Sequence, residues 1–143
     1  TEYTDVTWET CTLRQWLNDD FINSAFSRDE QKKIQTTTVV AQNNEIYGTD
    51  AGNDTQDKIF LLSIEEVNEY FDSSGEVACS PTDFAVANGA FERCGCCFWW
   101  LRSPGNSQRS AARIGDAGNV FVNGYDVSLD IEAIRPAMWI EIG

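Results

Sequence analysis

The cysteines carry the most specific chemistry in this sequence. Four of the five, Cys79, Cys94, Cys96 and Cys97, lie within nineteen residues of one another. A tetrahedral zinc site is disfavoured, because adjacent Cys96 and Cys97 rarely bind the same ion and the chain has no histidine to assist. Their spacing does not determine which cysteines pair, and an odd number leaves at least one thiol unpaired within the chain. We expect structural disulfides or buried thiols here rather than a catalytic centre.

An oxygen-rich loop is the second candidate for chemistry. Asp50, Asn53, Asp54 and Asp57 concentrate carboxylate and amide oxygens, which are the hard ligands that Ca²⁺ prefers. Their spacing is not that of an EF-hand, and Asx-rich turns often cap their own backbone without a metal. The loop therefore predicts a candidate calcium site, with a self-capping turn as the alternative.

The composition argues against several classes of function. A net charge of −13, from 23 acidic and 10 basic residues, repels a nucleic-acid backbone and an anionic membrane surface. Direct membrane insertion is not expected, because no apolar run approaches the roughly 18 residues of a span. The lack of histidine removes the commonest general base, and Glu65-Glu66 and Asp19-Asp20 resemble helix-surface charge. We therefore expect a protein that is not an enzyme.

The elements that would position these residues begin with helices. Apolar residues recur at helical spacing from about residue 12 to about residue 25, and Thr12-Leu-Arg-Gln15 resembles a capping box at the start. Further helices are predicted to start at the caps Ser27, Ser63 and Ser80-Pro81. Two strands are predicted between these helices, over residues 36–40 and 58–62.

The last third of the chain has the two-residue period of strands. Strands are predicted over residues 97–101, 111–114, 120–122, 125–127 and 134–142. Asn123-Gly124 is a strong hairpin signal, and Pro136 indicates an edge position or a bulge. Helices followed by a strand meander favour a single α+β domain over residues 1–143, with a small twisted antiparallel sheet and neighbouring chain ends.

Several motifs resemble a domain family of unknown function from surface proteins of gut bacteria and from phage-encoded proteins. They are Thr7-Trp-Glu-Thr-Cys-Thr-Leu-Arg14, Trp16-Leu-Asn-Asp-Asp-Phe21, Tyr47-Gly-Thr-Asp-Ala-Gly-Asn-Asp54, Asp57-Lys-Ile-Phe-Leu-Leu-Ser63, Trp99-Trp-Leu-Arg-Ser-Pro-Gly105, Ala111-Ala112 and Ile134-Arg-Pro-Ala-Met-Trp139. The resemblance covers nearly the whole chain. It implies a C-type-lectin-like fold, similar to that of formylglycine-generating enzymes and of the variable proteins of diversity-generating retroelements.

In such variable proteins, an error-prone reverse transcriptase rewrites adenine-containing codons, mostly for Asn, in a C-terminal cassette that faces ligand. Apart from Gln108, every residue type in 106–131 is reachable from an Asn codon by changes at its adenines. The segment is therefore a candidate variable ligand-binding region. Its expected contact residues are Arg109, Arg113, Asp116, Asn119, Phe121, Asn123, Tyr125, Asp126, Ser128 and Asp130.

We expect a non-catalytic domain that binds a protein or glycan on a cell or phage surface, in a secreted, surface or phage-particle protein. Ordinary solvated surface is the simpler interpretation of the same residues. One rival is a copper oxidase of the formylglycine-generating type using the cysteine cluster, although the spacing around the cysteines does not match. The other is a structural module.

Several arginines and tryptophans have apolar sequence neighbours, and we expect them to support the fold rather than to bind ligand. Arg102 and Arg135 lie among apolar residues, so each needs a carboxylate partner, with Glu9 and Asp19 as candidates. Trp16, Trp100 and Trp139 are expected in the core. The exposed face should tolerate substitution, because surface changes usually alter stability little.

Overall fold

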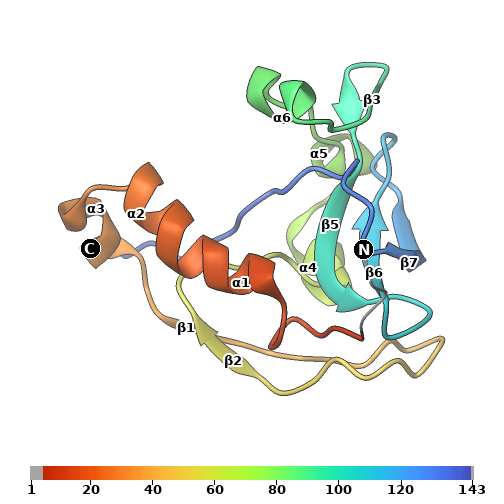
Figure 1. The fold of residues 1–143 in the computed structure, drawn as a ribbon, viewed down its shortest axis with the longest axis horizontal. Coiled ribbons are helices and arrows are strands. Elements are labelled where there is room, and N and C mark those ends of the chain that lie inside the picture. The colour runs from red at the N-terminus through yellow and green to blue at the C-terminus, as the bar shows by residue number, and fades with distance from the viewer. Residues whose placement is uncertain (1–4, 143) are drawn as a thin grey trace.

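The computed structural model describes residues 5–142 and begins with a helical run (Figure 1). Helix α1 (Thr12–Trp16), the π-helix η1 (Leu17–Phe21) and helix α2 (Ile22–Ala25) follow one another without a break, so the predicted helix over 12–25 is confirmed. The capping box predicted at Thr12 is wrong. Cys11 is the N-cap, and no side chain caps this helix start.

The capping boxes at Ser27 and Ser63 are confirmed. The Ser27 hydroxyl accepts the Glu30 N–H at 3.2 Å, and the Glu30 carboxylate accepts the Ser27 N–H at 2.8 Å, at the start of α3 (Arg28–Lys33). Ser63 and Glu66 make the same exchange before α4 (Ile64–Tyr70). Such a cap satisfies backbone donors that the first helical turn leaves unpaired.

The next helices differ from the prediction. A short helix that the sequence did not predict, α5, spans Ser74–Val77. The N-cap of helix α6 (Asp83–Ala87) is Thr82, two residues after the predicted cap Ser80, and its hydroxyl accepts the Ala85 N–H at 3.1 Å.

Three antiparallel strands form the main sheet, in the order β5 (Trp99–Pro104), β6 (Ser110–Ile114) and β7 (Val120–Asp126). The hairpin predicted at Asn123-Gly124 is wrong, because both residues lie inside β7. Between the pairs Arg113↔Phe121 and Ala111↔Tyr125, β7 advances by four residues while β6 advances by two. The extra residues on β7 form a bulge at this dipeptide. Gly124 has φ +68°, and a Cβ there would collide with the Ala111 carbonyl.

Two smaller strand pairs complete the secondary structure. Strand β1 (Thr37–Val39) pairs with β2 (Thr55–Asp57), and β3 (Glu92–Arg93) pairs with β4 (Cys96–Cys97). The strands predicted over 58–62 and 134–142 are not regular strands. The two segments meet through the isolated bridge Phe60↔Ala137, while a second bridge joins Ile140 to Ile34.

The hydrophobic core consists of two clusters on either side of β5. The first lies under the helical run and contains Trp8, Leu17, Ile22, Ile34, Val39, Ile59, Phe60 and Leu61. The second lies between the sheet and α4 and contains Val67, Val77, Trp99, Leu101, Ala112 and Ile114. Trp99 is fully buried in the second cluster, whereas its neighbour Trp100 packs against the first. The alternation of side chains along a strand explains this division.

The tryptophan prediction is partly wrong. Trp16 and Trp139 are each 46% exposed and do not belong to the core, and Trp100 is only partly buried. The buried tryptophans are Trp8 and Trp99. Trp139 instead makes an edge-to-face contact with Tyr70, with ring centroids 5.9 Å apart.

The partners of Arg102 and Arg135 differ from the predicted carboxylates Glu9 and Asp19. Arg102 is buried and ion-paired, but its partner is Glu66, and its guanidinium also donates to the Leu61 carbonyl at 2.8 Å and the Val40 carbonyl at 3.0 Å. Arg135 lies over the rings of Phe71 and Trp99, at 5.1 and 4.9 Å from their centroids. It donates to the Val77 carbonyl at 3.1 Å.

The overall class is α+β, as predicted, with helices first and small antiparallel sheets. The expected closeness of the chain ends is wrong, because the described ends lie at opposite sides of the molecule (Figure 1). Val6 bonds to the Gln108 carbonyl beside the main sheet, whereas Glu141 bonds to Lys33 beside the N-terminal helices. Within residues 5–142, none of the helices has the length and apolar character needed to span a bilayer.

Candidate ligand-binding site

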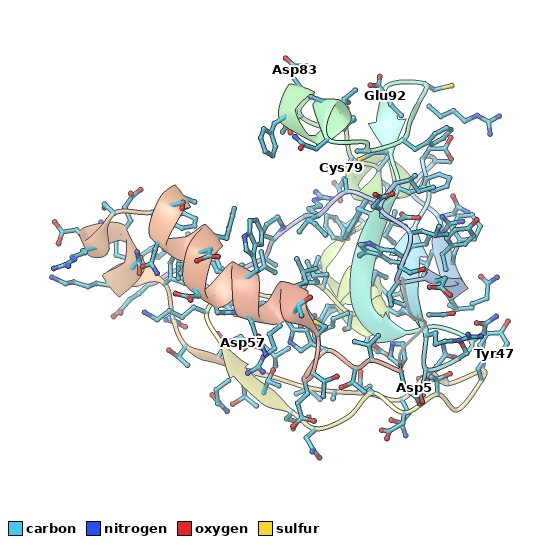
Figure 2. The ribbon with its side chains drawn as sticks, in the orientation of Figure 1. Asp5, Tyr47, Asp57, Cys79, Asp83 and Glu92 are labelled. Atoms are coloured by element: carbon cyan, nitrogen blue, oxygen red, sulfur yellow. The ribbon has the colours of Figure 1, made fainter. Side chains whose placement is uncertain are left out.

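A pocket of about 590 Å³ opens between the N-terminal segment and the main sheet. Trp8 and Leu13 form one wall, Trp100 and Ala111 form the sheet wall, and Ile134 closes the apolar lining. The backbone bond from Val6 to Gln108, 2.8 Å long, holds the N-terminal segment against the turn between β5 and β6. Asp5, another lining residue, lies near the end of the sheet where that turn is found (Figure 2).

The end of β7 and the turn after it supply two of the polar side chains that line the pocket, Asp126 and Ser128. Asp126 accepts hydrogen bonds from the Ser128 backbone N–H at 2.9 Å and from the Ser128 hydroxyl at 2.7 Å. These bonds, the backbone bond first, lower the pKa of Asp126, so its carboxylate stays charged near neutral pH. The pocket thus combines apolar walls with a fixed negative charge.

The predicted contact face is only partly a surface. Arg113 was expected to be exposed, but its side chain is 14% exposed and pairs at 2.6 Å with Glu132, whose side chain is fully buried. The guanidinium also lies over the rings of Phe98, Phe121 and Tyr125, at 4.6, 5.3 and 4.2 Å from their centroids. Arg113 therefore supports the sheet from within an aromatic cluster.

The other predicted contact residues fall into three groups. Asp126 and Ser128 line the pocket, and Phe121 and Asp116 are partly buried, Asp116 pairing with Arg93 at 3.7 Å. The exposed residues are Arg109, Asn119, Asn123, Tyr125 and Asp130. Sequence reasoning missed the N-terminal wall of the pocket, because no local pattern shows that Trp8 and Leu13 face Trp100 across the fold.

Burial raises the pKa of Glu132, although the hydrogen bond and the charge of Arg113 act in the opposite direction. The folded chain therefore holds this proton more tightly than the unfolded chain, in which the glutamate has its ordinary pKa of 4.5. By linkage, the contribution of Glu132 to stability is largest below pH 4.5 and is lost as pH rises through the higher folded-state pKa.

We expect the stability of wild type relative to Glu132→Gln to increase as pH falls from 7 towards 5, measured by urea unfolding at each pH. Glu30→Gln is the matched control with the opposite sign. The capping bonds from Ser27 lower the pKa of Glu30, so its stabilisation is lost at low pH. A pH-independent difference for Glu132→Gln would contradict the expectation.

Each predicted calcium ligand makes hydrogen bonds to the protein. Asp57 is buried and accepts from Arg14 at 2.7 Å, Trp8 at 3.0 Å and Thr55 at 2.6 Å. The other three side chains each have their own protein partner. Asp54 accepts the Ala41 N–H at 2.8 Å, Asp50 accepts the Gly52 N–H at 2.9 Å, and Asn53 donates to Glu9 at 3.3 Å.

Two of the cysteines pack against different core clusters. Cys11 packs against the first cluster, whereas Cys79 packs against the second and lies opposite buried Cys97 in a β-bridge. Cys94 is exposed at the turn between β3 and β4. Over the described part of the chain, no group of three or more cysteine, aspartate or glutamate side chains is placed to hold a metal ion.

The fold and the pocket define an α+β protein with an apolar, ligand-sized hollow beside an antiparallel sheet. The chain belongs to the family described as Domain of unknown function (DUF6273), which matches residues 1–142. No curated protein and no solved structure matches it.

Proposed function

We propose that the chain is a non-catalytic ligand-binding domain. Its binding surface is the pocket together with the exposed part of segment 106–131. The pocket carries this proposal, since its volume of about 590 Å³ falls within the roughly 300–1,000 Å³ of known ligand sites. Its lining is mainly apolar and also carries polar side chains, a combination that is typical of such sites.

The groups around the pocket are poor catalysts, which supports binding over chemistry. The chain has no histidine, and Asp126 is held by Ser128. Cys11 lines the pocket, but burial raises the pKa of its thiol. The thiol also donates a hydrogen bond to the Trp8 carbonyl at 3.3 Å. A protonated thiol is a weak nucleophile, so this cysteine lacks the activation that catalysis requires.

The proposed ligand is a protein or glycan on a cell or phage surface, with an apolar group that enters the pocket. This would place the domain in a secreted, surface or phage-particle protein. The order of helices and sheet supports the C-type-lectin-like fold that the motifs imply, whereas the separated chain ends do not. The proposal therefore rests on the pocket more than on the fold resemblance.

Diversification of segment 106–131 is a further part of this proposal, and the packing limits where it could occur. Ala112 and Ile114 are fully buried, and a Cβ at Gly118 would collide with the Ser74 carbonyl. Variable positions would have to be exposed ones such as Asn119 and Asn123. Substitutions among sister copies of the gene should then avoid the three packed positions.

The binding proposal predicts that N-phenyl-1-naphthylamine, a neutral apolar dye, binds with one site per chain and gains fluorescence. Ala111→Leu fills part of the pocket and should weaken binding at least about tenfold. Ala117→Leu makes the same change at an exposed turn position and should leave binding unchanged. Equal binding by both variants, or none by the wild type, would refute the pocket as the site.

A further inference from the structure

Cys79 and Cys97 lie opposite each other on neighbouring segments. They face each other in an antiparallel bridge, where the Cys97 N–H donates to the Cys79 carbonyl at 2.8 Å. The Cys97 thiol lies 3.3 Å from the same carbonyl oxygen. The direct backbone bond makes them a hydrogen-bonded pair, the wider kind of antiparallel pair, whose Cβ atoms lie about 5.5 Å apart. A disulfide needs about 3.5–4.5 Å, so the two Cβ atoms must approach by about 1–2 Å for the bond to form.

We propose that Cys79 and Cys97 form a disulfide when the protein meets an oxidant such as glutathione disulfide. The other cysteines are less well placed. Cys96 points to the opposite face of β4 from Cys97, because side chains alternate along a strand. Cys94 lies beyond the bridge at the exposed turn, and Cys11 belongs to the other core cluster.

The bond would close a loop that contains all of α6 and the β3–β4 hairpin. This segment, residues 79–97, projects from one end of the sheet, and Cys79 lies at its base (Figures 1 and 2). It exposes two aromatic side chains, Phe84, which is 79% exposed, and Phe91, which is 46% exposed. The backbone bond from Phe91 to Ile131, 2.9 Å long, also ties it to the chain after β7.

The chemistry is a two-step exchange. Cys79 is partly exposed, so its thiolate attacks glutathione disulfide, forming a mixed disulfide and releasing one glutathione. Buried Cys97 then attacks the Cys79 sulfur, and a second glutathione leaves with the electron pair and takes up a proton. Two thiols are thus oxidised by two electrons, and one glutathione disulfide is reduced.

The second step should be slow at neutral pH. Burial is the largest of the effects that raise the pKa of Cys97, to about 11, so little thiolate is present at pH 7. Closure should therefore speed up by about tenfold for each pH unit between pH 7 and 9.

Trypsin provides a direct test, because it cuts after Lys58, Arg93 and Arg102. Cys79 then lies in peptide 59–93, and Cys94, Cys96 and Cys97 lie in peptide 94–102. We expect glutathione disulfide, followed by alkylation and non-reducing digestion, to give these two peptides as one linked mass. Cys94→Ser and Cys96→Ser should keep the link, whereas Cys97→Ser should abolish it.

Thermal unfolding provides an independent readout. Oxidation should raise the melting temperature of wild type by roughly 5–15 °C, since the bond closes a loop of this length in the unfolded chain. The rise should persist in Cys11→Ser and disappear in Cys79→Ser. The proposal fails if oxidised wild type retains all its thiols, or if the link survives Cys97→Ser.

Discussion

Asp57→Ala is expected to lower the free energy of unfolding by about 3–5 kcal/mol, because breaking a buried ion pair leaves an uncompensated charge. The Asp57 side chain is 2% exposed, and its pair with Arg14 joins β2 to the helical run. The indole of Trp8 and the hydroxyl of Thr55 would lose their acceptor in the same change. Urea unfolding of both proteins measures the difference.

Asp54→Ala is the matched control, since Asp54 is exposed and accepts one backbone N–H from Ala41. It should cost about 1 kcal/mol or less. Because Asp57 already has three protein partners, we also expect millimolar Ca²⁺ to leave the melting temperature of wild type unchanged. A calcium-dependent rise that Asp57→Ala removes would instead show that the loop binds the ion.

Trp99→Ala should be as damaging, at about 3–5 kcal/mol, because it removes a fully buried aromatic side chain from the second cluster. Two further interactions would be lost. The Trp99 indole donates to the Val77 carbonyl at 3.2 Å, and its ring lies under the guanidinium of Arg135. Both link the sheet to segments outside it.

Trp139→Ala is the control for this second prediction, because Trp139 is 46% exposed. It should lose the contact with Tyr70 and cost about 1 kcal/mol. Comparable losses for the two variants in urea unfolding would show that the division between buried and exposed tryptophans is wrong.

Local signals were the part of the fold that the sequence predicted best. The boxes at Ser27 and Ser63 were identified because each involves partners only three residues apart. Asn123-Gly124 was misassigned for a physical reason. A positive φ at glycine suits both a hairpin turn and a bulge, and only the pairing of β7 with β6 distinguishes them.

Long-range pairing explains the errors at the candidate site. The sequence indicated that Arg102 needs a carboxylate, but Glu66 is one of many acidic residues and lies 36 positions away. Arg113 alternates with apolar neighbours, a pattern typical of an outward side chain. Its burial depends on Glu132, on the ring of Phe98 and on two rings of β7, which no period in the sequence shows.

Glu66 makes the folding of one helix depend on the folding of the sheet. The same carboxylate oxygen accepts the Ser63 N–H at the start of α4 and pairs with Arg102 on β5. A seven-residue helix is too short to persist alone in water, so its nucleation draws on this remote contact. The helix and its contact with the sheet therefore stabilise each other, as cooperative two-state folding requires.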